Sequence, residues 1–95
     1  MKKVIFLATL ALIGCATESK YRTKLNSWLQ RSKEDLVTSW GVPDKTYKLD
    51  KKTELLAYTH STKVNKVKYW CTTTFTLKKD IVDSWIVEGN DCRSY

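Results

Sequence analysis

The sequence lacks internal repeats and low-complexity segments, and it contains one proline and three glycines among its 95 residues. A chain of this length is too short for two independent hydrophobic cores, so we expect one small domain. Its longest apolar run, Val4 to Ile13, would rise only about 15 Å as a helix. That is roughly half the hydrocarbon thickness of a bilayer, so the run is too short to be a membrane-spanning helix.

Residues that carry chemistry are also scarce. His60 is the single histidine, and a Ser/His/Asp set could be assembled only from it with Asp50 or Asp80, without a nucleophile elbow to frame it. The ten carboxylates are dispersed, with no metal-loop spacing and no evident acid/base pair. We therefore predict no enzyme activity, no metal site and no cofactor.

The first fourteen residues have the layout of a secretory signal, with Lys2 and Lys3 before the apolar run and Gly14 before Cys15. Without residues 1–14 the chain keeps 15 basic and 10 acidic side chains, because only two lysines are removed. The resulting net charge of +5 favours anionic phospholipid headgroups or an acidic partner. The basic residues are dispersed along the chain and mixed with acidic ones, so we predict no nucleic-acid partner.

Leu12, Ile13, Gly14 and Cys15 resemble the lipobox of bacterial lipoproteins, in which the signal is cleaved before a lipidated cysteine. The resemblance implies that Cys15 becomes the palmitate-bearing N-terminus and that residues 15–20 form a lipidated tether. Two or three acyl chains anchor a protein to a membrane essentially permanently. Ala16 stands where enteric bacteria place an aspartate for inner-membrane retention, which implies the periplasmic face of the outer membrane. The alternative is an ordinary signal with cleavage elsewhere.

Cys71 and Cys92 remain as an even pair in an oxidising compartment, where small domains commonly carry disulfides. A disulfide between them would close a loop of roughly 21 residues and stabilise the domain by about 3 kcal/mol on the chain-entropy model. The alternative, a metal or redox pair, lacks the close cysteine spacing and extra ligands of zinc sites.

Periodicity predicts two helices after the tether. Apolar residues recur at helical spacing from about residue 21 to 30. A second helix is expected to begin at Lys33, because Ser32 and Asp35 resemble a capping box. Gly41 is placed for a left-handed cap at its end, and Pro43 prevents its continuation.

Beyond Pro43 the pattern becomes extended. Strands are expected over residues 45–49, 53–59, 66–77 and 81–88, with a polar loop over 61–65. The predicted fold of residues 21–95 is α+β, with two N-terminal helices packed on a three- or four-stranded antiparallel sheet in the order ααβββ.

A hairpin centred near Lys79 would place Cys71 opposite about Val87 or Glu88 and bring Cys92 within disulfide range. Alternation puts Tyr69 and Cys71 on the core face, together with Thr73, Phe75 and Leu77. Lys66, Lys68 and Trp70 fall on the opposite face, where an aromatic flanked by cations is a candidate contact with a partner or with headgroups. The alternative for Trp70 is packing under a loop. The lysines at 51, 52, 78 and 79 are interpreted as ordinary turn charges.

The order of elements resembles the SmpA/OmlA (BamE-like) family of small outer-membrane lipoproteins, over about residues 25–90. The resemblance lies in the lipobox, in Trp40-Gly41-Val42-Pro43 after a helix pair, and in Tyr58, Phe75, Trp85 and Gly89. It implies a scaffold or accessory subunit in outer-membrane protein assembly and envelope integrity, with assembly proteins or other envelope lipoproteins as partners. Alternatives are direct contact with the cell wall or anionic lipid, and a small enzyme inhibitor.

Overall fold

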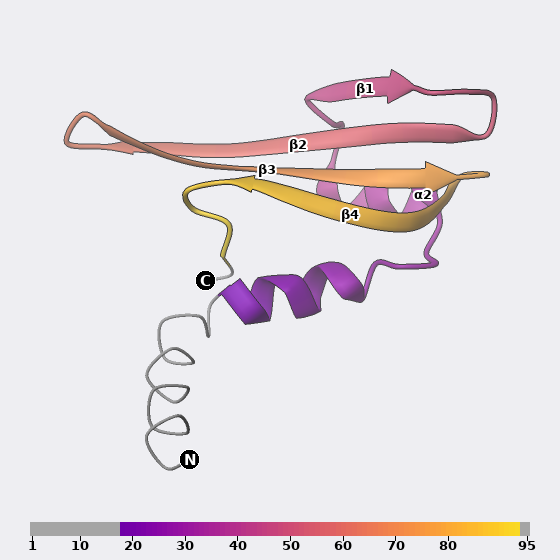
Figure 1. The fold of residues 1–95 in the computed structure, drawn as a ribbon, viewed down its shortest axis with the longest axis horizontal. Coiled ribbons are helices and arrows are strands. Elements are labelled where there is room, and N and C mark those ends of the chain that lie inside the picture. Colours follow the sequence, from indigo (N-terminus) through magenta and orange to yellow (C-terminus); the bar gives the residue numbers. More distant parts are fainter. Residues whose placement is uncertain (1–17, 94–95) are drawn as a thin grey trace, which may run out of the picture.

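The computed structural model describes residues 18–93 of the chain. Two helices precede four strands, which form one antiparallel sheet in the order β1-β2-β3-β4 (Figure 1). Both helices lie on the same side of this sheet, so the predicted α+β architecture is confirmed with a fourth strand. The predicted signal peptide and Cys15 lie outside the described residues.

The helices follow the sequence signals closely. Residues 18–26 are helical, so the helix already includes residues 18–20 of the expected tether. Helix α2 spans Lys33–Trp40, and the Asp35 backbone N–H donates to Ser32 Oγ over 3.1 Å, as the capping pattern predicts. It ends at Gly41, whose φ of 87° lies in the positive region that glycine adopts without strain.

The sheet consists of β1 (Lys45–Lys48), β2 (Thr53–Val64), β3 (Val67–Lys78) and β4 (Ile81–Gly89). The prediction of a loop over residues 61–65 is wrong, because β2 continues to Val64 and pairs there with Val67. The polar residues of this segment are exposed. Their strand conformation depends on backbone pairing with β3 rather than on burial, so the hydrophobic pattern carried no sign of it.

The β3–β4 pairing contains a β-bulge that the sequence did not reveal. Leu77 pairs with Val82 but Thr76 pairs with Ser84, which leaves Asp83 as an extra residue on β4. The bulge shifts the register by one and places Cys71 opposite Gly89 instead of Glu88, so the expected pairing with Val87 or Glu88 is wrong.

Within the described residues, one hydrophobic core fills the space between the helices and one face of the sheet. Trp40 at the end of α2 contacts Phe75 edge-on, with ring centroids 5.1 Å apart, and Tyr58 donates to the Gly41 carbonyl over 2.9 Å. The buried members of this core are Leu25, Trp28, Leu36, Leu56, Tyr58, Phe75, Leu77 and Val82. These contacts fix the helix pair beneath the middle of the sheet.

Candidate functional site

The outer end of the β2–β3 hairpin, residues 60–70, extends beyond the rest of the sheet, and we call it the hairpin tip (Figure 1). Pairing with β1 ends at Ala57 on β2, and pairing with β4 ends at Cys71 on β3. Past these points β2 and β3 pair only with each other, as far as Val64 and Val67. An isolated two-stranded hairpin is marginally stable in water, so the hairpin tip depends on how its base is held.

Side chains hold the base of the hairpin tip on both edges. On the β2 edge, the Thr59 N–H donates to Asp44 Oδ2 over 2.7 Å. On the β3 edge, the Trp70 N–H donates to Asn90 Oδ1 over 2.8 Å, and Asn90 Nδ2 donates to the Lys68 carbonyl over 3.0 Å. These side chains form hydrogen bonds with backbone groups that would otherwise pair with a neighbouring strand. The four-stranded part of the sheet therefore ends at the base of the hairpin tip.

The C-terminal segment is covalently attached at the same place. Cys71 and Cys92 form the predicted disulfide, with a Cα–Cα distance of 4.9 Å. At Gly89, three residues before Cys92, the chain passes so close to β3 that an added Cβ would lie 2.3 Å from the Trp70 carbonyl oxygen. The disulfide and this close approach keep Asn90 against β3 and thereby support the hairpin tip.

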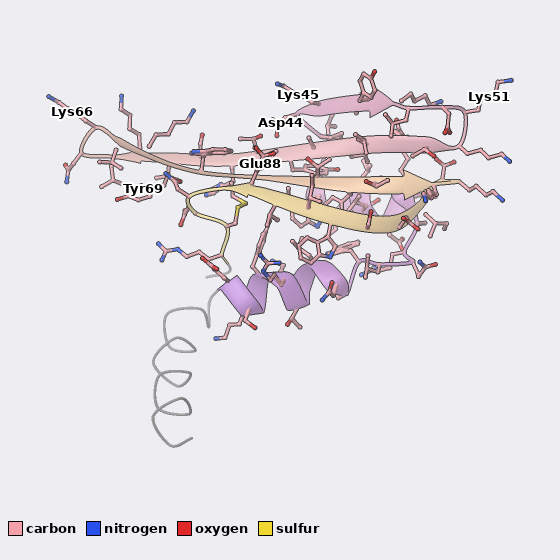
Figure 2. All side chains as sticks on the ribbon, in the orientation of Figure 1. Asp44, Lys45, Lys51, Lys66, Tyr69 and Glu88 are labelled. Atoms are coloured by element: carbon pink, nitrogen blue, oxygen red, sulfur yellow. A yellow bond between two sulfur atoms is a disulfide. The ribbon has the colours of Figure 1, made fainter. Side chains whose placement is uncertain are left out.

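The charge of the hairpin tip is entirely positive. Lys63, Lys66 and Lys68 are exposed, and residues 60–70 contain no acidic side chain. Lys63 and Lys68 are cross-strand partners, and Lys66 lies in the turn at the far end, where Figure 2 shows it pointing away from the domain. This surface would attract an anionic partner or lipid headgroups.

The side of the hairpin tip that faces the helix layer carries three exposed apolar residues together with the polar Thr62 and His60, and we call it the apolar side. Val64 and Val67 are each 49% exposed and lie directly opposite each other. Tyr69 follows on the same face and is 38% exposed, so the expectation that it packs inward is wrong. Its face is as predicted, but the helices do not reach beneath the hairpin tip to cover it (Figure 2).

Only two of the three contact residues expected from sequence therefore lie on the same face of the sheet. Lys68 and Trp70 share the face opposite Tyr69, and Lys66 lies in the turn. Trp70 is half-buried whereas Tyr69 is exposed, which reverses the contrast that singled out Trp70. Val64 and Val67 were not among the expected contact residues, although two valines placed symmetrically around two turn residues are typical of a hairpin.

The remaining candidates do not converge. His60 lies seven residues along β2 from Thr53, about 23 Å from the end of the sheet at which Asp50 and Asp80 lie. Across residues 18–93, no group of three His, Cys, Asp or Glu side chains could hold a metal ion. Within the same residues, neither helix has the length and apolar character needed to cross a membrane.

Comparison of this chain with protein-family models, curated proteins and solved structures finds no match. The resemblance to the SmpA/OmlA family therefore stays an expectation from sequence. Among residues 18–93, the hairpin tip combines a projecting two-stranded ribbon with exposed apolar side chains and exposed lysines.

Proposed function

We propose that this chain is a non-enzymatic envelope lipoprotein, anchored through Cys15 on the periplasmic face of the outer membrane. In this proposal it acts as a scaffold or accessory subunit in outer-membrane protein assembly and envelope integrity. The observation that carries the proposal is the hairpin tip, a projecting two-stranded segment with one apolar side, one lysine-rich side and no covering element among the described residues.

Two properties of the hairpin tip suit it to protein docking. Its β2 edge beyond Thr59 carries backbone groups that β1 does not pair, so a partner strand could add there. Its apolar side presents Val64, Val67 and Tyr69, and aromatic residues are enriched among the side chains that dominate binding energy. The lysines around them would accelerate encounter with an acidic partner and discourage edge-to-edge aggregation.

The position of the N-terminal helix adds to the proposal. Helix begins by residue 18, only three residues beyond Cys15, and three residues reach about 10 Å when extended. A lipidated Cys15 would therefore hold the domain at the membrane surface. A hairpin confined in this way meets other membrane-bound proteins at a raised effective concentration, so a weak interface suffices.

Site-specific photo-crosslinking in cells tests the proposal. A crosslinking residue placed at Val67 should capture subunits of the barrel-assembly machinery or other envelope lipoproteins, identified by mass spectrometry. The same residue placed at Thr38, exposed on α2, is the control and should capture much less. Equal recovery of these proteins from both positions would contradict docking through the hairpin tip.

Two matched tyrosine variants measure the contribution of the apolar side. Tyr69→Ala should weaken capture by a factor corresponding to at least ~1 kcal/mol while leaving the unfolding free energy nearly unchanged. Tyr47→Ala removes an equally large side chain, 64% exposed on β1, and should leave capture intact. Trp70→Ala should also weaken capture if Trp70 is a contact residue, whereas a core role would instead lower stability by roughly 3 to 5 kcal/mol.

Direct contact with anionic lipid is the second candidate, and a specific feature favours it. Val64, Val67 and Tyr69 lie on the core-facing side of the sheet, against which the N-terminal helix packs, and Lys66 lies in the turn next to them. This arrangement would let the apolar side enter the headgroup region while the ammonium group of Lys66 in the turn meets a lipid phosphate. Crosslinks from Val67 to lipid alone, without envelope proteins, would favour this candidate over a scaffold.

A further inference from the structure

At the end of the sheet opposite the hairpin tip, the β1–β2 loop, the β3–β4 turn and the start of α2 border a surface cavity of about 160 Å³. Five of its nine lining residues are lysines, and two are acidic. The lysines are Lys33, Lys48, Lys51, Lys52 and Lys79, and we call this site the lysine cup. Figure 2 shows Lys51 at this end of the molecule and Lys66 at the other.

Most of the positive charge in the lysine cup is unneutralised. One of the acids, Glu54, is engaged by Lys33, whose Nζ donates to Glu54 Oε1 over 2.7 Å. Among the ion pairs of residues 18–93, none involves the other four lysines of the cup. The lining therefore carries five positive and two negative charges, and the second acid, Asp80, is outnumbered.

The backbone around the lysine cup is held in place by hydrogen bonds. Asp50 Oδ1 accepts from the N–H groups of Lys52 and Thr53, over 2.8 and 2.7 Å, and this shapes the β1–β2 loop. The Lys79 N–H donates to the Lys52 carbonyl over 2.7 Å, which joins that loop to the β3–β4 turn. Lysines from two segments 27 residues apart are thus kept beside one cavity although their charges repel each other.

We propose that the lysine cup is a binding site for a phosphate-bearing anion. An anion of charge −2 would relieve the repulsion among the unpaired lysines, and lysine is a common point-charge ligand of phosphate. The cavity is smaller than the 300 Å³ or more typical of sites for whole cofactors, so it admits a phosphate group rather than a nucleotide. This site is separate from the hairpin tip and does not depend on the function proposed for it.

Phosphate titration of the full chain in a neutral detergent, followed by amide NMR at constant ionic strength, tests the site. Inorganic phosphate should shift the amides of residues 50–53 and 78–80 along saturating curves, with smaller shifts at residues 63–68. The double variant Lys51→Gln with Lys79→Gln should weaken the affinity at least tenfold.

The matched control is Lys63→Gln with Lys66→Gln, which removes the same charge at the hairpin tip. Its affinity for phosphate should stay within twofold of the unmodified protein, and thermal melts establish that both double variants are folded. Equal losses in the two variants would mean that only net charge matters. Either that result or shifts that fail to saturate would overturn the proposal.

A second arm identifies the source of the phosphate group. Neutral phosphatidylcholine vesicles with and without phosphatidylglycerol are compared for retention of the protein. If the phosphate belongs to a lipid headgroup, retention by phosphatidylglycerol should fall more in the lysine-cup variant than in the control. If it is a free phosphate, the two variants should be retained equally while their titrations with inorganic phosphate still differ.

Discussion

Gly89→Ala should be the most damaging single-methyl substitution in this domain. Gly89 pairs with Cys71 at the end of β4, and its φ is +140°, a conformation that L side chains rarely adopt. A Cβ there would lie 2.3 Å from the Trp70 carbonyl oxygen and 2.9 Å from the Cys71 Cα. All of these neighbours are backbone atoms of β3, which cannot rotate away, so either the strand or the C-terminal segment must move.

The magnitude can be separated into two terms. Backbone strain at a position reserved for glycine costs about 1 to 3 kcal/mol, and forcing an extra carbon into a filled space costs a further 1 to 3 kcal/mol. Gly89→Ala should therefore lower the free energy of unfolding by about 2 to 6 kcal/mol. For a domain of this size, even 1 kcal/mol shifts the melting temperature by roughly 4 to 8 °C.

Gly41→Ala provides the matched control. Gly41 also has positive φ, 87°, but a Cβ there would meet nothing within 4 Å, so only the strain term applies. Urea unfolding of both variants with the disulfide intact should place Gly89→Ala at least 1 kcal/mol below Gly41→Ala. Equal losses would refute the steric argument and would show that β4 and the C-terminal segment can withdraw from β3 without penalty.

Three further predictions concern the cysteines and two tyrosines, Tyr58 in the core and Tyr21 packed against it. Cys71→Ser and Cys92→Ser should lower stability by similar amounts, about 2 to 5 kcal/mol each, and two titratable thiols in the non-reduced, denatured protein would contradict the bridge. Cys15→Ser should abolish palmitate labelling, and label retained on a processed form would place the anchor elsewhere. Burial raises the pKa of both Tyr21 and Tyr58, so their contribution to stability is complete below about pH 10 and declines as pH rises through the raised values. Tyr58→Phe should make alkaline unfolding less steep, and an unchanged pH profile would show that this phenol does not contribute.

Local signals in the sequence accounted for much of the fold. Ser32 and Asp35 predicted the start of α2 because a capping hydrogen bond involves only neighbouring residues. Alternation along β3 predicted the buried positions Cys71 and Phe75, since one face of that strand packs on the core throughout the covered part of the sheet.

The errors arose where the outcome depends on distant parts of the chain. The exposure of Tyr69 depends on how far the helices extend, and nothing near residue 69 encodes that length. The bulge at Asp83 moves the whole partner strand by one residue, and Asp83 itself carries no distinguishing sequence signal. The hairpin tip was missed because an exposed ribbon has no burial pattern along β2.

The two tight turns of the sheet place lysine where glycine would be favoured. Asn65 and Lys66 have φ values of 50° and 70°, and Lys79 and Asp80 have values of 54° and 62°, all in the left-handed region. Each lysine therefore carries a conformational cost that Lys66→Gly or Lys79→Gly would remove, with a gain of about 0.5 to 1 kcal/mol in stability. Lys66 belongs to the hairpin tip and Lys79 to the lysine cup. A lysine therefore lowers the stability of the turn at each end of the sheet, and a glycine variant could recover that stability. Each such variant would also remove one positive charge from the hairpin tip or from the lysine cup.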